Sequence, residues 1–416
     1  MTDLGAYVLD WLHLIVRWGH MIAAIGWIGT SFYFISLDLG LIPSATPSVV
    51  GEAWEIHGGG FYRIEKFRVA PPQLPVSLRW FKWEAYLTWL TGFALLVLLY
   101  YLDPYAFLID PRVAALEPWQ AVGASVALLV VGWIAYDRLA SALETRPRAL
   151  AVAVMILVVG VVFVASAVFG SRAAYIHVGA TLGTWMSANV LFVIIPGQRD
   201  LIRQSERGSG SAGPSESTGS GALAASGRRS PPPTAINRGK QRSVHNNYLT
   251  LPVLFAMISQ HFPFTYGNAN APLVLLGLMA AGAIAQHYLN LRHQGRADRR
   301  VLAAAATIAV GVAVAIAPTA NGAAAVELSA TERSAVMPVI AARCQPCHSR
   351  APTMPGITAA PKGLVLDPPE QVRANARRIY EQVVLTRNMP LGNQTGMTDA
   401  ERDLISRWFR SGASLP

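Results

Sequence analysis

Charged side chains are scarce in this chain of 416 residues. They make up 14% of it, whereas hydrophobic residues make up 52%. Soluble domains carry about 25% charged residues, so the composition argues against an ordinary soluble protein. Cysteine is nearly absent, with two residues in the whole sequence, which leaves nothing to build a disulfide-rich scaffold. The scarcity makes the position of those two cysteines informative.

The apolar residues are gathered in long runs. A membrane-spanning helix needs about 20 mostly apolar residues, within a range of roughly 17–25. Eight runs approach or reach that length, near residues 11–39, 83–102, 119–136, 149–171, 173–196, 248–262, 271–290 and 301–318. The run 248–262 is the shortest and carries polar residues. The sequence therefore predicts an all-α fold, with a polytopic bundle of about eight transmembrane helices in a lipid bilayer.

The formal charge of +10 is distributed unevenly between the predicted loops. Twenty lysines and arginines fall in four loops that share one side of the bundle, namely 40–82, 137–148, 198–244 and 291–300. The loops of the opposite side hold two, Arg112 and Arg172. Because short cytoplasmic loops are enriched in Lys and Arg, this bias predicts which side of the membrane each loop faces. It explains the net positive charge without a nucleic-acid partner. The N-terminus and the C-terminal part are expected on the periplasmic side of a bacterial inner membrane.

A cleaved signal peptide is an alternative for the first run. The N-terminus has no early Lys or Arg, and His13, Arg17 and His20 interrupt the apolar stretch. That pattern differs from a basic segment followed by a plain apolar core, so a permanent first helix is favoured.

Composition divides the chain into two domains. We expect the bundle over residues 1–318, with a flexible cytoplasmic linker at about 198–244 whose middle is rich in Gly, Ser and Pro. The loop 40–82 is rich in aromatic residues instead, and is expected to be ordered against the inner mouth of the bundle. Residues 319–416 have a soluble composition. Two capping-box patterns and a Pro-Pro pair predict three helices there.

The cysteines form the motif Cys344-Gln345-Pro346-Cys347-His348. Two thiols at this spacing add to the two vinyl groups of a haem, and the adjacent histidine then becomes an axial ligand of the iron. A chance pentapeptide or a disulfide is the alternative. The motif follows a capped helix in a domain expected on the side where c-type haems are assembled, so we predict one covalent haem c held by Cys344, Cys347 and His348.

The second axial ligand is expected on a loop before the last helix. Met389 lies there, and Met397 is the alternative. Histidine and methionine ligation raises the haem potential, as suits an electron acceptor. Residues 319–416 are therefore expected to form a small, class I-like cytochrome c domain.

Ionisable side chains inside spanning helices suggest a function, because they cost about 2.5–3.5 kcal/mol to insert. His13, Arg17 and His20 share one face of the first helix. His177 and His261 are expected at the same outer depth. His13, His20, His177 and His261 could ligate a second, non-covalent haem, or Arg17 with histidines could hold an anionic substrate and move protons. Solvated interfacial residues are the third interpretation, above all for His13 and His261.

The chain resembles the bacterial membrane-bound urate oxidases (urate hydroxylases) with a fused cytochrome c domain. The stretches that carry the resemblance are GHMIAAIGWIGTSFYFISLDL, GEAWEIHGGGFYRIEKF, RWFKWEAYLTWLTGF, KQRSVHNNYLTLPVLFAMISQH, RCQPCHSRAPT and RNMPLGNQTGMTDAER. They occur in order over nearly the whole chain, and the Gly/Ser/Pro-rich linker is the departure.

The resemblance implies oxidation of urate to 5-hydroxyisourate in purine degradation. Electrons would leave through the c-haem to a respiratory-chain acceptor, a cytochrome or a terminal oxidase. Urate is an anion near neutral pH, so an arginine partner is reasonable, and Arg17, His20 and His177 are the candidate catalytic residues. The alternatives are a quinol-linked electron-transfer protein without a purine site, and a transporter.

Overall fold

A computed structural model describes residues 3–67, 74–75, 77–209, 233–317, 327–355, 357 and 359–415. The middle of the predicted linker, 210–232, and the predicted domain boundary at 318–319 lie outside these ranges. Helices flank the linker on both sides, since α7 continues to Ser209 and α8 begins at Pro233.

Each of the eight predicted apolar runs coincides with a helix. The helices of the bundle are α1 (Asp3–Gly40), α2 (Trp83–Leu96), α3 (Pro104–Phe107), α4 (Pro118–Ala142), α5 (Pro147–Val168), α6 (Ser171–Asn189), α7 (Ile195–Ser209), α8 (Pro233–Ile258), α9 (Pro263–Tyr266), α10 (Ala271–His293) and α11 (Arg299–Ala315). One π-helical turn, Val97–Tyr101, extends α2, and another, Val190–Ile194, joins α6 to α7. Proline opens several helices at positions where no backbone N–H is needed, as at Pro118 and Pro147.

Among the described residues, six helices are long and apolar enough to cross a membrane. They run over Tyr7–Gly40, Trp83–Tyr101, Pro118–Ala142, Pro147–Val168, Ser171–Arg203 and Ala271–His293. The other two predicted spans coincide with α8, which carries many polar residues, and with α11, which has 17 residues. Large apolar side chains on α1, such as Trp11, Trp18 and Ile25, are exposed, as a lipid-facing helix requires.

The prediction of an all-α fold is wrong for the loop after α1, which contains a β-hairpin. Strand β1 (Val49–His57) pairs with antiparallel strand β2 (Gly60–Phe67). The turn residues Gly58 and Gly59 have φ angles of +56° and +80°, the left-handed conformations that a tight two-residue hairpin turn requires. The triple glycine was the signal for this turn.

The core of the bundle surrounds α6. Residues 173–178 of this helix are all buried, and they pack with side chains from α4, α5, α8 and α10. Small residues allow the close approach, because a Cβ atom at Gly179 would lie 3.1 Å from Ala256 Cβ on α8. His177 is therefore on the most enclosed helix of the bundle.

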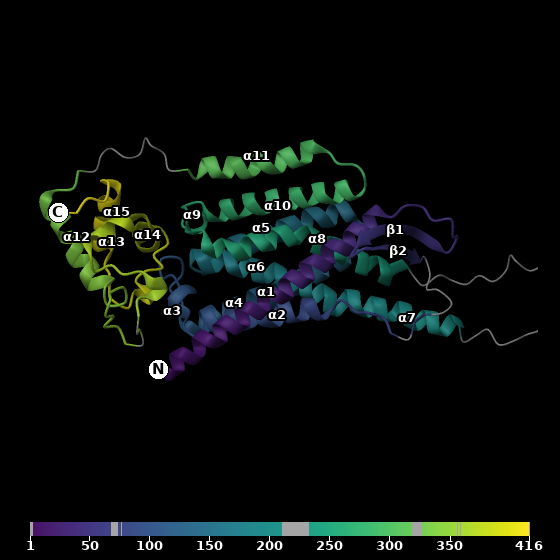
Figure 1. The fold of residues 1–416 in the computed structure, drawn as a ribbon, viewed down its shortest axis with the longest axis horizontal. Helices are drawn as coiled ribbons and strands as arrows, with labels where there is room; N and C mark the ends of the chain where they lie inside the picture. Colours follow the sequence, from purple (N-terminus) through teal and green to yellow (C-terminus); the bar gives the residue numbers. More distant parts are fainter. Residues whose placement is uncertain are drawn as a thin grey trace, which may run out of the picture.

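The connecting segments are divided between two ends of the bundle (Figure 1). The N-terminus, α3 and α9 lie at the end where the C-terminal domain sits, and the hairpin lies at the opposite end. The loops 103–118 and 263–270 thus share an end with the C-terminal domain, as the charge distribution predicts. Which end faces the periplasm stays a prediction.

The C-terminal domain is a small helical unit. Its helices are α12 (Ala330–Arg343), α13 (Pro369–Ala374), α14 (Ala376–Tyr380) and α15 (Asp399–Arg410). Both predicted capping boxes are confirmed, at Ser329 with Glu332 and at Thr398 with Glu401. The predicted middle helix is broken at Asn375 and ends in a π-helical turn, Glu381–Leu385. A separate apolar core includes Val336, Ile340, Ile379, Ile405 and Trp408.

Candidate functional site

The cysteine motif lies where α12 ends. Cys344 is the C-terminal capping residue of that helix, and its carbonyl accepts hydrogen bonds from the backbone N–H groups of Cys347 (3.2 Å) and His348 (2.8 Å). Burial raises the pKa of the Cys344 thiol to about 12 and also raises the pKa of Cys347. Both thiols are therefore neutral at physiological pH, and the turn holds them and the histidine close together.

His348 is oriented by its own backbone neighbourhood. Its Nδ1 lies 3.1 Å from the carbonyl oxygen of Leu364 and donates to it, while the Leu366 N–H donates to the carbonyl of His348 at 2.7 Å. A metal-ligating histidine generally donates its other ring N–H to such a carbonyl, which fixes the tautomer and the ring. Nε2 of His348 is left as the atom able to bind iron.

The two candidate methionines have different surroundings. Met389 is half-buried at the edge of the apolar core that also touches Cys344 and Leu364. Its N–H donates to the Gln382 carbonyl (3.0 Å), and its own carbonyl accepts from Arg402 (2.8 Å). Met397 is 3% exposed and belongs to the core itself. The packing therefore favours Met389 as the ligand and Met397 as a core residue.

These residues fit a covalent c-haem. Two thiols, an imidazole with a free Nε2 and a half-buried thioether are the donor set that histidine–methionine haem ligation needs, and Cys344 and Met389 border the same apolar core. Cys344, Cys347, His348 and Met389 would hold the group.

Arg402 secures the loop that carries Met389. It is 5% exposed, and its Nη1 donates to the carbonyls of Val383 (2.6 Å) and Met389 (2.8 Å). We expect Arg402→Gln to destabilise this loop, because each buried carbonyl without a donor costs about 1–3 kcal/mol. Thermal melting followed by the haem absorption should show a lower midpoint. Arg410→Gln, an exposed position on the same helix, is the control, and equal melting of the two variants would contradict this role.

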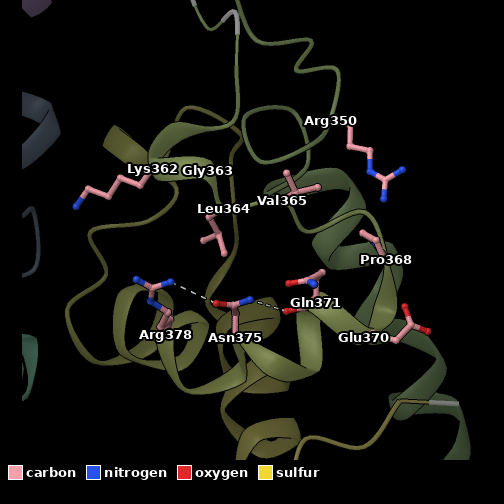
Figure 2. Close-up of a pocket in the computed structure, with 10 residues that line it drawn as sticks. All are labelled: Arg350, Lys362, Gly363, Leu364, Val365, Pro368, Glu370, Gln371, Asn375 and Arg378. Atoms are coloured by element: carbon pink, nitrogen blue, oxygen red, sulfur yellow. Dashed lines mark hydrogen bonds between the residues drawn. The ribbon is translucent and has the colours of Figure 1, made fainter.

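A separate pocket of about 480 Å³ opens on the C-terminal domain (Figure 2). Leu364 lines it, together with the cations Arg350, Lys362 and Arg378. The side chains of Cys344, Cys347, His348 and Met389 are not among its lining residues. The pocket is therefore distinct from the group of proposed haem ligands, although it shares Leu364, whose carbonyl contacts His348, with their surroundings.

The C-terminal domain is docked on the end of the bundle. The turn after α9 leaves no room at Gly267, where a Cβ atom would lie 3.0 Å from Thr386 Cγ2 and 3.3 Å from Leu385 Cβ. Gly392 is also in contact with the bundle, because a Cβ atom there would lie 3.7 Å from the carbonyl oxygen of Tyr105 in α3, an ordinary van der Waals distance. The loop that carries Met389 is thus in direct contact with α3 and α9.

A group of polar side chains lies at this junction, which we call the junction cluster: Tyr100, Arg172, His177, Tyr266 and Asn388. Arg172 donates to Gln260 Oε1 (3.2 Å) and lies 4.2 Å above the Phe107 ring. Arg172 is also beside the hydroxyl of Tyr100, and Asn388 is beside that of Tyr266. Burial raises the pKa of Tyr266, so its hydroxyl is neutral at physiological pH.

His177 is fully buried within this cluster. Its ring stacks on Phe169, with centroids 4.6 Å apart, and meets Tyr100 edge-on at 5.6 Å. Nδ1 donates to the Ala173 carbonyl (2.7 Å), which leaves Nε2 as an unprotonated acceptor. Among the residues that the structure describes, none forms a hydrogen bond with Nε2.

The other predicted membrane residues are differently engaged. Arg17 donates to His13 within α1 (2.8 Å), and His20 Nδ1 contacts Thr88 and Thr91 of α2 (both 3.0 Å). His261 is exposed. Within the described ranges, no hydrogen bond or ring contact joins His20 to His177.

The contacts of these histidines are relevant to the predicted second haem. His177 is enclosed by two aromatic rings, and His13 is paired with Arg17. A second, non-covalent haem held by two of His13, His20, His177 and His261 stays a prediction.

The opposite end of the bundle holds a second buried polar group. Asn189 donates to Asn246 (2.8 Å) and to the Tyr136 hydroxyl (3.1 Å), which contacts His245 at 2.7 Å. Asn290 donates to Asn247 (2.7 Å). These residues join α4, α6, α8 and α10, mainly through hydrogen bonds to one another.

Sequence reasoning missed four members of the junction cluster. Tyr100 and Tyr266 read as ordinary aromatic residues, Arg172 was counted only as a loop charge, and Asn388 is one residue before a proposed haem ligand. The position of Asn388 next to Met389 was the available signal, because a residue beside the proposed haem ligand must lie near the part of the bundle that contacts this loop.

One family model, described as urate oxidase N-terminal, matches residues 6–317. The match covers the bundle and ends before the C-terminal domain. No curated protein and no solved structure matches the chain.

Proposed function

The chain belongs to the urate oxidase N-terminal family, and from this premise we propose that it oxidises urate to 5-hydroxyisourate in purine degradation. Electrons pass through the C-terminal cytochrome c domain to a respiratory-chain acceptor, a cytochrome or a terminal oxidase. The single observation that carries this proposal is the docking of the Met389 loop on the bundle that the family model covers.

The reaction balances without oxygen as a reactant. A urate monoanion takes up one water molecule, whose oxygen bonds to C5, and it loses one proton and two electrons. A c-haem held by Cys344, Cys347, His348 and Met389 would accept one electron at a time, so each urate would require the haem to be reduced twice, with reoxidation by the external acceptor in between. The bundle must therefore hold the anion close to that domain and receive the proton.

The proposed location follows from charge and chemistry. The lysine- and arginine-rich loops lie in the cytoplasm, so the N-terminus and the cytochrome domain lie in the periplasm of a bacterial inner membrane. Within the bundle, His177, Arg17 and His20 remain the proposed catalytic residues. His177 has the best support, because it belongs to the junction cluster through its contact with Tyr100.

The number of electrons transferred per urate, measured under argon, tests the proposed reaction. With ferricyanide as one-electron acceptor, purified protein should reduce two ferricyanide ions for each urate consumed. A requirement for oxygen would contradict the proposal. Oxidation of a quinol with urate left unchanged would favour the quinol-linked alternative.

The proposed axial role of Met389 has its own test. Met389→Ala should remove the absorption of methionine-ligated ferric haem. It should lower the midpoint potential by on the order of 0.1 V, a fraction of the ~0.8 V that axial ligands span. Redox titration and visible spectra measure both.

Met397→Ala is the matched control. It should cost roughly 2–5 kcal/mol of stability, as core truncations do, and keep the methionine-ligated spectrum. If Met397→Ala removes that spectrum and Met389→Ala keeps it, the assignment is reversed.

A further inference from the structure

Within the described part of the chain, the junction cluster holds four buried polar atoms that make no well-formed hydrogen bond, although Arg172 lies beside the Tyr100 hydroxyl and Asn388 beside that of Tyr266. They are Tyr100 Oη, Arg172 Nε, His177 Nε2 and Asn388 Nδ2, each shielded from solvent. Tyr100 and His177 are 1% and 0% exposed as whole residues. A buried polar atom without a partner costs about 1–3 kcal/mol, so four such atoms at one place indicate a ligand that satisfies them.

The chemistry of the four atoms describes that ligand. Arg172 Nε and Asn388 Nδ2 are donors, and the Arg172 charge favours an anion. His177 Nε2 is an acceptor, because its Nδ1 carries the proton donated to Ala173. The Tyr100 hydroxyl can act as a hydrogen-bond donor or as an acceptor. A planar anion with carbonyl acceptors on one edge and a ring N–H on another matches this set.

The cluster is also built from both domains. Tyr100, Arg172 and His177 come from the bundle, whereas Asn388 comes from the loop of the C-terminal domain and directly precedes Met389. Tyr175 links α6 to α9 and α10 at the junction, since its hydroxyl lies within hydrogen-bond distance of the carbonyls of Thr265 (3.3 Å) and Ala271 (2.6 Å).

The polar group at the opposite end also has unpartnered atoms, among them Asn189 Oδ1. Asn189 is twelve residues beyond His177 on the same helix, which places it about 18 Å further from the C-terminal domain at 1.5 Å per residue. An electron donor at the junction cluster is therefore much closer to the docked domain.

We propose that the junction cluster is the urate site, closed on one side by Asn388 of the cytochrome domain. This inference rests on the proposed function. Arg172 and Asn388 donate to the carbonyl edge of the urate monoanion. His177 Nε2 accepts a hydrogen bond from a ring N–H and takes that proton as the ring loses two electrons to the acceptor, and the water that then adds gives its OH to C5 and its other proton to a ring nitrogen. The fused domain is thus part of the substrate site as well as the electron acceptor.

Equilibrium dialysis of radiolabelled urate against the full-length protein in detergent tests the site. Reduction with dithionite beforehand prevents turnover, so the measurement reports binding alone. Arg172→Gln should weaken urate binding 10- to 100-fold, the range for a charged hydrogen bond. Asn388→Ala should weaken it several-fold while the haem spectrum stays unchanged.

Two further variants distinguish a specific urate site from a general effect of charge or stability. Arg112→Gln removes the other arginine of this end, which is exposed and paired with Asp110, and it should bind urate normally. Tyr100→Phe removes an unpartnered buried hydroxyl, so it should weaken binding without lowering the melting temperature.

The outcomes separate the two proposals. If urate reduces the haem of the unaltered protein but Arg172→Gln and Asn388→Ala bind urate normally, the junction site is wrong and the proposed function stands. Equal weakening by Arg112→Gln and Arg172→Gln would also overturn the site, because it would indicate a general charge effect. Absence of urate binding and of urate-driven haem reduction in the unaltered protein contradicts both.

Discussion

Replacing both cysteines by serine is expected to abolish covalent haem attachment and all urate-driven electron transfer. Cys344 and Cys347 are the only cysteines of the chain, and serine hydroxyls do not form the thioether bonds. The variant should show no haem stain on a denaturing gel and no reduction of ferricyanide by urate. Urate binding to the bundle should persist in weakened form, because Arg172 and His177 are unaffected.

Pro346→Ala is the control for this change. It alters a residue between the two thiols, and the backbone carbonyl that accepts from Thr353 and Met354 is kept. This variant should retain both the stain and the activity. A double-serine variant that still reduces ferricyanide with urate would show that electrons bypass the C-terminal domain.

His177→Gln is expected to slow urate-driven haem reduction by about 10²- to 10⁴-fold, the usual contribution of a positioned proton acceptor. The physical reason is the free Nε2 of a buried ring whose Nδ1 is committed to Ala173. Anaerobic stopped-flow mixing with urate measures the rate. Reduction by dithionite should be unchanged, because the change lies outside the haem domain.

His261→Gln is the matched control, since it replaces an exposed histidine at the same end of the bundle. Its rate should stay within a factor of two or three of the unaltered protein. Comparable losses in the two variants, or a His177→Gln rate close to normal, would remove His177 as the proton acceptor.

The helices could be predicted because each leaves a local signal in the sequence. Long apolar runs, the Ser329 and Thr398 capping boxes and the Pro369 start all coincide with observed helices. The hairpin was missed because its strands lie in a segment judged by its aromatic content, although Gly58 and Gly59 mark its turn. A strand pair of this length depends on pairing between residues apart in the chain, which composition does not report.

The candidate site could be predicted only where the ligands are neighbours in sequence. The Cys344–His348 motif is local, and His177 was found because an imidazole inside an apolar run is unusual. Tyr100, Arg172 and Asn388 come from three distant segments. Packing within the bundle brings Tyr100 to Arg172, and the docking of the C-terminal domain adds Asn388 beside Tyr266. Such a site has no sequence pattern of its own.

The central claim is that urate delivers electrons to the c-haem within this one chain. The most direct measurement is anaerobic addition of urate to the purified, oxidised protein while its visible spectrum is recorded. The account predicts a reduced c-type band that grows in proportion to urate until every haem is reduced. A spectrum that stays oxidised with urate, in protein whose haem dithionite still reduces, would contradict it.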